Sequence, residues 1–471
     1  MFKEERNACL VRQRTDLFCG GVSLLAVQWW RLLATCLTNI TVWPKFFFIL
    51  LSKAKSVLIK PLKKLVYSCL LWLNIAVPVH ALDVNAALEN AFRLGEHAKY
   101  GRLKLDMRYR YENVRVSANL LTKPANANTL RLRLGYLSPE LFHLQTYIEY
   151  AGNLAMQEDF NSSRNGFTEY EAIADPQAQE LNQFWLSYRG IPNTVLQGGR
   201  QRINLDNERF IGSVDWRQLE QTFDSFLIRN QSIDNLTLNF IYIGGVQTVT
   251  AGNKTVEMPL LNFTYKFGRF SSLTGYAYWL ADYDNLSQST QTYGVRMQGA
   301  PKLKYDIQLS YDIAYSNQSS YRHNPASYNL DRYNLLLGVS YIGITLKSGI
   351  ELLGGNGKQA FQTPLGTTHD FQGWADQFLV TPSDGVRDIQ ASIDKIFYGV
   401  KFMFAYHAFA GSSGQGDYGD EYDFLVSKQF GEHYQLLAKY AYYDAGNTFA
   451  AQKAGVDKNT QKIWLQGHIR F

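Results

Sequence analysis

Arginine is the residue type whose placement in this sequence suggests a chemistry. Residues 196–229 read LQGGRQRINLDNERFIGSVDWRQLEQTFDSFLIR, and several arginines stand there among aspartates and glutamates, between two predicted strands. A guanidinium group stays protonated at physiological pH and can bind a carboxylate through two parallel hydrogen bonds. Fixed arginines on a water-facing surface therefore predict the binding or conduction of an anionic solute.

Basic residues recur on one face of two further predicted strands. In residues 102–112 (RLKLDMRYRYE) and 129–136 (TLRLRLGY), basic or acidic residues alternate with apolar ones, as the two-residue period of a strand requires. If the charged face borders an aqueous lumen, the candidate pore-lining residues are Lys104, Arg108, Arg110, Arg131, Arg133, Arg200, Arg202, Arg209 and Arg217, with Asp206 and Glu208 among them. The alternative is that acids and arginines pair across strands and only stabilise the wall.

A second candidate region follows Leu353. Residues 354–385 form a long glycine-rich segment, and such loops in a compact fold are usually functional or disordered. The side chains that could gate a pore or stack on a sugar ring are His369, Asp370, Trp374 and Asp376. Their spacing is a weak metal pattern, so no metal or cofactor is predicted. The histidines after residue 81 show no GxSxG or HExxH context, which predicts that the protein is not an enzyme.

The elements that would position these residues are strands. From residue 101 to the end, alternating segments recur roughly eighteen times, each about nine to eleven residues long, which is the length that a tilted strand needs to cross a bilayer. Strands of soluble proteins are shorter. The 30 Tyr, 28 Phe and 9 Trp suit aromatic girdles at two membrane interfaces, although core packing in a large soluble sheet is the alternative. The sequence predicts an all-β fold, a transmembrane antiparallel β-barrel of about 18 strands over residues 101–471.

The N-terminal part predicts export. Residues 60–81 have three lysines, an apolar run and a small-residue cleavage site, the layout of a secretory signal peptide. Residues 1–59 are predicted to be an N-terminal extension, of which residues 1–56 are not translated because the start lies near Val57; an additional membrane anchor is the alternative. Residues 82–100 are predicted to be a short periplasmic lead-in containing one helix. All four cysteines precede residue 82, and the chain after it carries 36 basic against 38 acidic residues, which argues against a disulfide framework and a nucleic-acid partner.

The C-terminus carries the expected insertion signal. The last ten residues, KIWLQGHIRF, alternate in polarity and end on the aromatic Phe471, as in barrels of the Gram-negative outer membrane. This strand predicts contact with outer-membrane lipid and with the barrel-assembly machinery.

Several long segments together resemble the alginate export family of outer-membrane porins. They are LKLDMRYRYE, TLRLRLGY, DPQAQELNQFWLSYRG (175–190), GGRQRINLDNERFIGSVDWRQLEQTFD (198–224) and GTTHDFQGWADQFLVTPSDGVRD (366–388). The resemblance implies a monomeric barrel of eighteen strands whose electropositive lumen passes alginate, an anionic polysaccharide, with periplasmic export partners. The many acids beside the arginines depart from a purely basic lumen. A general diffusion porin, or a barrel that serves as an adhesin or scaffold, are the alternative functions.

Overall fold

The computed structural model describes residues 80–117, 122–414 and 416–471. The predicted N-terminal extension, all but the last two residues of the predicted signal peptide, and the four cysteines lie outside the described residues.

Eighteen strands account for most of the described chain, which confirms the predicted fold class. They are β1 (Arg102–Val116), β2 (Ala125–Leu137), β3 (Leu144–Asp159), β4 (Ala178–Tyr188), β5 (Thr194–Gln201), β6 (Thr222–Asn230), β7 (Leu236–Gln247), β8 (Asn253–Phe267), β9 (Ser271–Asp282), β10 (Thr290–Gly299), β11 (Gln308–Ser320), β12 (Asn329–Tyr341), β13 (Ile344–Leu353), β14 (Val386–Phe397), β15 (Val400–Ala410), β16 (Asp417–Phe430), β17 (Tyr434–Ala445) and β18 (Thr460–Arg470). Two α-helices, α4 (His80–Phe92) and α5 (Phe449–Ala454), and four 3-10 turns, η1 (Glu96–Ala98), η2 (Leu286–Gln288), η3 (Lys304–Asp306) and η4 (Thr368–Asp370), complete the described elements.

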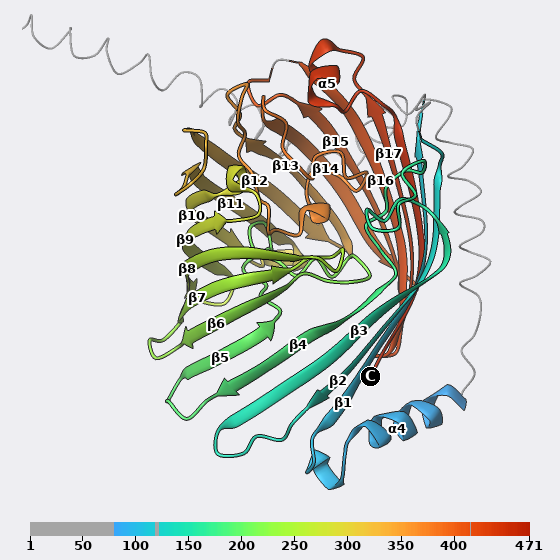
Figure 1. Cartoon of the computed structure of the whole chain (residues 1–471), viewed down its shortest axis with the longest axis vertical. Helices are drawn as coiled ribbons and strands as arrows, with labels where there is room; N and C mark the ends of the chain where they lie inside the picture. The colour runs from blue at the N-terminus through green and yellow to red at the C-terminus, as the bar shows by residue number, and fades with distance from the viewer. Residues whose placement is uncertain (1–79, 118–121, 415) are drawn as a thin grey trace, which may run out of the picture. The chain divides into compact units, whose positions relative to one another are not determined.

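Every strand pairs antiparallel with its neighbours in the chain, and β1 closes the sheet by pairing with β18 from Asp106↔Arg470 to Val116↔Thr460. Closure leaves no unpaired strand edge, which a structure surrounded by lipid requires. Because the strand number is even, β1 begins and β18 ends at the same end of the barrel, where α4 also lies (Figure 1). In the described residues no helix is long and apolar enough to span a membrane.

The two ends of the barrel differ in their connections. At the α4 end the turns are short, such as 342–343 between β12 and β13 and 398–399 between β14 and β15. At the other end the connections are longer, above all 202–221 between β5 and β6 and 354–385 between β13 and β14. Short periplasmic turns and long extracellular loops are typical of outer-membrane barrels, and the α4 end is the one with the short turns.

Alternating polarity sets the two faces of the wall. On β2, Leu132 and Leu134 are 38% and 46% exposed on the outer face, whereas Arg131 and Arg133 point inward and are buried. The exposed face is therefore apolar along β2, as contact with lipid requires, and the polar face is covered from inside.

The observed strands range from 8 residues in β5 to 16 in β3, so several are longer than the expected nine to eleven. Alternating polarity runs on from Ile396 to Tyr406, but a turn at Tyr398 and Gly399, with φ of 49° and 72°, separates β14 from β15. Residues 304–306 form a 3-10 turn, so β11 begins only at Gln308. Alternation continues across a two-residue turn, so it cannot by itself locate the turn.

Candidate functional site

The 202–221 loop and the 354–385 loop fold against the inward face of the barrel wall and pair with each other. Ile211 and Leu365 form a parallel bridge, and the amide of Gly212 donates to the carbonyl of Leu365 at 3.0 Å. Ile211, Leu365 and Ile203 belong to an apolar cluster with inward side chains of β6–β9 such as Phe223. The two loops together form the constriction, the name used below for these loops and the wall residues that hold them.

Wall arginines of β1 hold the 202–221 loop by its backbone. Arg108 donates through Nη1 to the carbonyl of Asp215 at 2.8 Å, also reaches the carbonyl of Arg217, and donates through Nε to Oε1 of Gln218 at 2.9 Å. Arg110 donates to the carbonyl of Trp216 at 2.6 Å. Carbonyl groups of a buried loop lack the partners that a sheet would provide, and the guanidinium donors supply them.

The arginines of β2 and the loop itself are paired with carboxylates. Arg133 lies 2.7 Å from Asp215 and 3.2 Å from Glu220, and Arg131 lies 3.3 Å from Asp215. Arg202, beyond the end of β5, bonds to Glu220 and lies 2.8 Å from Glu149. These pairs join the wall to the loop, and within the wall Arg131 pairs across strands with Asp106 of β1 at 2.5 Å.

Buried ion pairs also hold the 354–385 loop. Arg209 donates to Glu351 on β13 and to Gln372 in the loop, both at 3.0 Å. Asp376 lies 3.4 Å from Arg217 and 2.7 Å from Lys462 of β18. Arg217 thereby links the two loops to each other.

His369 and Lys439 form the centre of an aromatic cluster. The ammonium of Lys439 on β17 lies 4.0 Å from the ring centre of Trp216 and 3.8 Å from that of Trp374, within cation–π range. It also lies 2.9 Å from Nε2 of His369; since an ammonium only donates, Nε2 accepts, and Nδ1 donates to Asp376 at 2.7 Å.

The protonation states of His369 and Asp376, which are hydrogen-bonded to each other, follow from their surroundings. Burial lowers the pKa of His369 to about 3, so that the imidazole is neutral at neutral pH. Burial opposes ionisation of Asp376, but the hydrogen bond from neutral His369 and the positive charges of Lys462 and Arg217 hold the pKa of its carboxyl well below its usual range.

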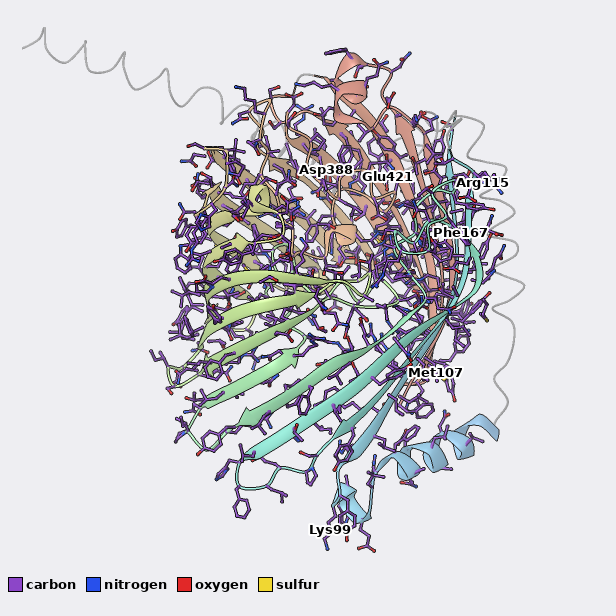
Figure 2. All side chains as sticks on the ribbon, viewed as in Figure 1. Lys99, Met107, Arg115, Phe167, Asp388 and Glu421 are labelled. Atoms are coloured by element: carbon purple, nitrogen blue, oxygen red, sulfur yellow. The ribbon has the colours of Figure 1, made fainter. Side chains whose placement is uncertain are left out.

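Two acids of β16 bind the 354–385 loop by its amides. Glu421 accepts a hydrogen bond from the amide of Ala375 at 2.6 Å, and Asp423 accepts one from the amide of Trp374 at 3.3 Å. Figure 2 labels Glu421 and, close by, Asp388, whose carboxylate lies 3.0 Å from Nδ1 of His407. Among the described residues no group of three or more His, Cys, Asp or Glu could hold a metal ion.

The remaining predicted site residues lie in different surroundings. Asp206 accepts from Asn262 at 3.0 Å, Glu208 accepts from Thr367 at 2.6 Å, and Asp370 is exposed on the loop. Lys104 is exposed on the inward face of β1, at the α4 end. Phe471 lies at that end too, where its ring stacks on His433 with centroids 4.2 Å apart.

Arg200 is the one predicted lumen residue that the strand register places elsewhere. It stands directly opposite Phe184 of β4, an outward side chain that is 55% exposed, and residues opposite each other in an antiparallel pair share a face. It pairs with Asp224 at 2.8 Å. Arg200 therefore lies on the outer face of β5, whereas Arg202 follows the end of that strand at Gln201 and belongs to the loop.

The sequence analysis did not single out the strand residues that hold the loops. They are Glu149, Glu351, Glu421, Asp423, Lys439 and Lys462. An isolated charge in an alternating strand was the available signal, but it does not reveal the partner.

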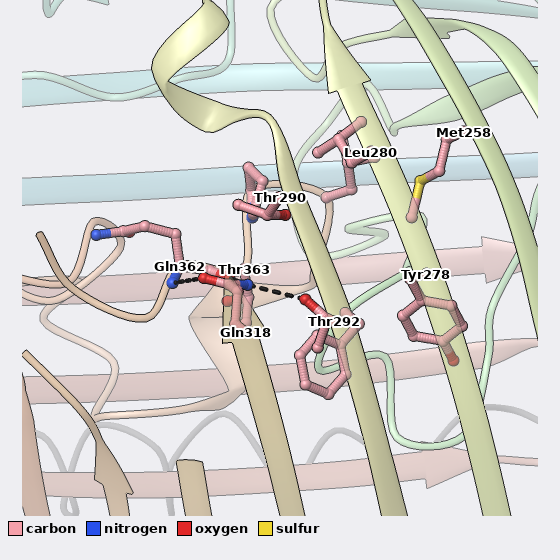
Figure 3. A pocket seen from close by; sticks show the side chains of 11 residues that line it. Met258, Tyr278, Leu280, Thr290, Thr292, Gln318, Gln362 and Thr363 are labelled. Atoms are coloured by element: carbon pink, nitrogen blue, oxygen red, sulfur yellow. Dashed lines mark hydrogen bonds between the residues drawn. The ribbon is translucent and has the colours of Figure 1, made fainter. Parts of the chain in front are cut away.

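A small cavity lies between the 354–385 loop and the wall (Figure 3). Its volume of about 20 Å³ has room for one water molecule. Gln318 donates to Thr292 at 3.0 Å and to the carbonyl of Gln362 at 2.8 Å, so the polar groups of its lining pair with each other. The cavity is a gap in the packing of the loop against the wall.

Comparison with known proteins gives one family and many barrels of similar fold. The alginate export family model matches residues 102–349, just over half of the 471-residue chain. No curated protein matches the chain.

Solved structures with a similar fold include OpdL of Pseudomonas aeruginosa, with 16% identity and a TM-score of 0.60 over 79% of this chain and 98% of that one. OccAB3 of Acinetobacter baumannii has 13% identity and a TM-score of 0.63 over 79% of this chain and 99% of that one. The outer membrane protein OpdK of Pseudomonas aeruginosa is also similar (12%, 0.57, 78% and 99%).

Proposed function

The chain belongs to the alginate export family and is a channel-forming β-barrel of the bacterial outer membrane; we propose that the solute it conducts is an acidic polysaccharide of the alginate type, a polyuronate. The observation that carries this proposal is the gathering of arginines from β1, β2 and the 202–221 loop around one constriction. Arg108, Arg110, Arg131, Arg133, Arg202 and Arg217 all contribute.

The arginines at the constriction differ in whether their side chains are exposed to a polymer in the lumen. Arg108, Arg110 and Arg131 are buried and bound to protein groups, so they act on a solute only through their field. The side chains of Arg202 and Arg470 are 36% and 58% exposed. A carboxylate of the polymer can exchange with the carboxylates that pair with these exposed arginines, which gives weak, successive contacts instead of one tight site.

Planar-bilayer conductance tests the proposal. We expect an anion-selective channel that short oligouronates block, with the block weakening as the Debye length falls from about 10 Å at 0.1 M salt to about 3 Å at 1 M. Replacing Arg202 and Arg470 together by Gln should lower the anion preference and weaken the block about two- to tenfold.

The matched control is Arg322→Gln. Arg322 is also a partly exposed arginine paired with a glutamate, Glu257, but outside the constriction. A channel that is cation selective, or that passes neutral sugars and uronates equally well, would point to a general diffusion porin.

A further inference from the structure

On the α4 side of the constriction, the lumen wall carries a second group of residues, which adjoins the arginine network at Glu149. Lys104 of β1, Gly135 of β2, Tyr147 of β3 and Trp185 of β4 follow one another across four neighbouring strands. Lys104 pairs with Gly135, and Tyr147 pairs with Trp185, in the strand register. Because Phe184 and Leu186 face outward with more than half of each side chain exposed, Trp185 between them faces the lumen.

Gly135 allows this group to form. A Cβ atom at Gly135 would lie 2.2 Å from Oη of Tyr147, so any larger residue would displace the tyrosine ring. With glycine there, the ring lies against the wall, 96% buried, and its hydroxyl donates to Glu149. The centroids of Tyr147 and Trp185 are 5.7 Å apart, and Trp185 remains partly exposed beside it.

Lys104 differs from the other predicted pore-lining cations in having no acidic partner. Its ammonium lies 5.1 Å from the ring centre of Tyr147, and among the residues that the structure describes it makes no hydrogen bond or ion pair. Eight other predicted cations, from Arg108 to Arg217, bind carboxylates or carbonyls of the protein. An ammonium held over a tyrosine ring but free of anions is available to a carboxylate from outside.

We propose that Trp185 and Lys104 form a subsite for one uronate residue, on the α4 side of the constriction. The apolar face of the pyranose ring would stack on the indole, and its carboxylate would meet the ammonium of Lys104. Tyr147 is a positioning residue, because it holds both the indole and the ammonium without being exposed itself. The subsite rests on the proposed function, since it names where a polyuronate engages the wall before the constriction.

The subsite is tested by the time for which a single probe molecule blocks a single channel, called the dwell time below. The probes are a short oligouronate and a neutral oligosaccharide of equal length. Trp185→Ala should shorten the dwell time of both probes about three- to tenfold, because stacking on the indole uses the apolar face of a sugar ring and does not require the sugar to be charged. Lys104→Gln should shorten only the dwell time of the oligouronate, about two- to fivefold, and this difference should vanish at 1 M salt. Trp185→Phe, which keeps an aromatic ring, should retain most of the stacking.

The controls are matched in residue type. Trp279 of β9 donates a hydrogen bond to Tyr293 of β10 on the outer face of the wall. Lys99 is an exposed lysine ahead of β1 (Figure 2). Trp279→Ala and Lys99→Gln should leave both dwell times unchanged.

Chemical rescue separates charge from structure, because the sequence has no cysteine after Cys69. In Lys104→Cys, a thiol reagent that adds an ammonium should restore the oligouronate dwell time, and one that adds a sulfonate should shorten it further. The unsubstituted channel, treated with the same reagents, shows any effect of labelling elsewhere.

The outcomes distinguish the subsite from the proposed function. If oligouronates block the channel but their dwell times are unchanged by the substitutions of Trp185 and Lys104, the subsite is wrong and the proposed function stands. If Lys104→Gln changes the dwell times of both probes equally, or if Trp185→Ala changes only that of the neutral probe, the uronate assignment is overturned. If oligouronates do not block the unsubstituted channel at all, the proposed function itself fails.

Discussion

The constriction and the wall on its α4 side contain the same kinds of residue in opposite states. At the constriction, Arg131 and Arg217 are buried and shared among several carboxylates. On the α4 side of the constriction, Lys104 is exposed and its ammonium lies over the ring of Tyr147. The difference teaches that basic residues of a lumen have two separate roles. Those that hold a loop in place are buried and neutralised by the protein, and those that contact a solute keep part of the side chain exposed, as Arg202 and Lys104 do.

The strongest test of this contrast is the removal of Asp376. Asp376→Ala leaves Lys462 and Arg217 without their shared carboxylate, and breaking a buried ion pair from one side costs about 3–5 kcal/mol. We expect the 354–385 loop to detach, single-channel conductance to rise, and resistance to heat in detergent to fall. Lys358→Ala, an exposed change in the same loop, is the control. Unchanged conductance in Asp376→Ala would mean that this loop does not restrict the lumen.

A paired comparison of one arginine and one lysine sharpens the contrast. Arg131→Gln should lower the free energy of unfolding by about 3 kcal/mol, because Asp106 and Asp215 lose a buried partner. Lys104→Gln should change that free energy by less than about 0.5 kcal/mol, since it removes an exposed charge without an acidic partner. Urea unfolding in detergent, followed by tryptophan fluorescence, measures both. Equal destabilisation by the two changes would remove the distinction between holding and free cations.

The smallest expected effect concerns a titratable contact at the α4 end. His433 lies 2.7 Å from Glu89 of α4 and donates to the carbonyl of Arg470 at 2.6 Å. Burial lowers the pKa of His433, but these two contacts outweigh it and raise that pKa above its ordinary value. A raised pKa in the folded state means that the stabilisation is present at low pH and is lost as the pH rises through that pKa.

Hydrogen exchange of the α4 amides, corrected for intrinsic rates, should therefore show weaker protection at about pH 8 than at about pH 6. Glu89→Gln should abolish the difference. A pH dependence that survives in Glu89→Gln would assign it to another group. This contact, unlike the pairs at the constriction, can be switched off without a mutation.

The fold could be predicted from the sequence because its signal is local. Each strand shows its own alternation, as Leu132 and Leu134 against Arg131 and Arg133 do, and the segment length distinguishes a membrane barrel from a soluble sheet. The resemblance to the alginate export family, which the family model confirms, supported the number of strands.

The state of each charged residue could not be predicted in the same way, because it depends on pairs far apart in the chain. Arg110 meets Gln466 across 356 residues, and Arg209 meets Glu351 across 142. Arg200 was misplaced because alternation alone does not show which face of β5 is turned inward, and its register opposite the exposed Phe184 does. Lys104 looked like its arginine neighbours, and only the glycine and tyrosine across two other strands set it apart.

The pairing of β1 with β18 has a consequence for how the molecule assembles. Leu105, near the start of the barrel, exchanges two backbone hydrogen bonds of 2.9 Å with Phe471, the final residue. The seam cannot close until β18 has been synthesised, and contacts between segments so far apart in the chain form slowly. Until then both outer strands present open edges that invite association with other chains. Pairing of β1 with β18 removes these edges, so closure of the seam and protection from association with other chains are the same event.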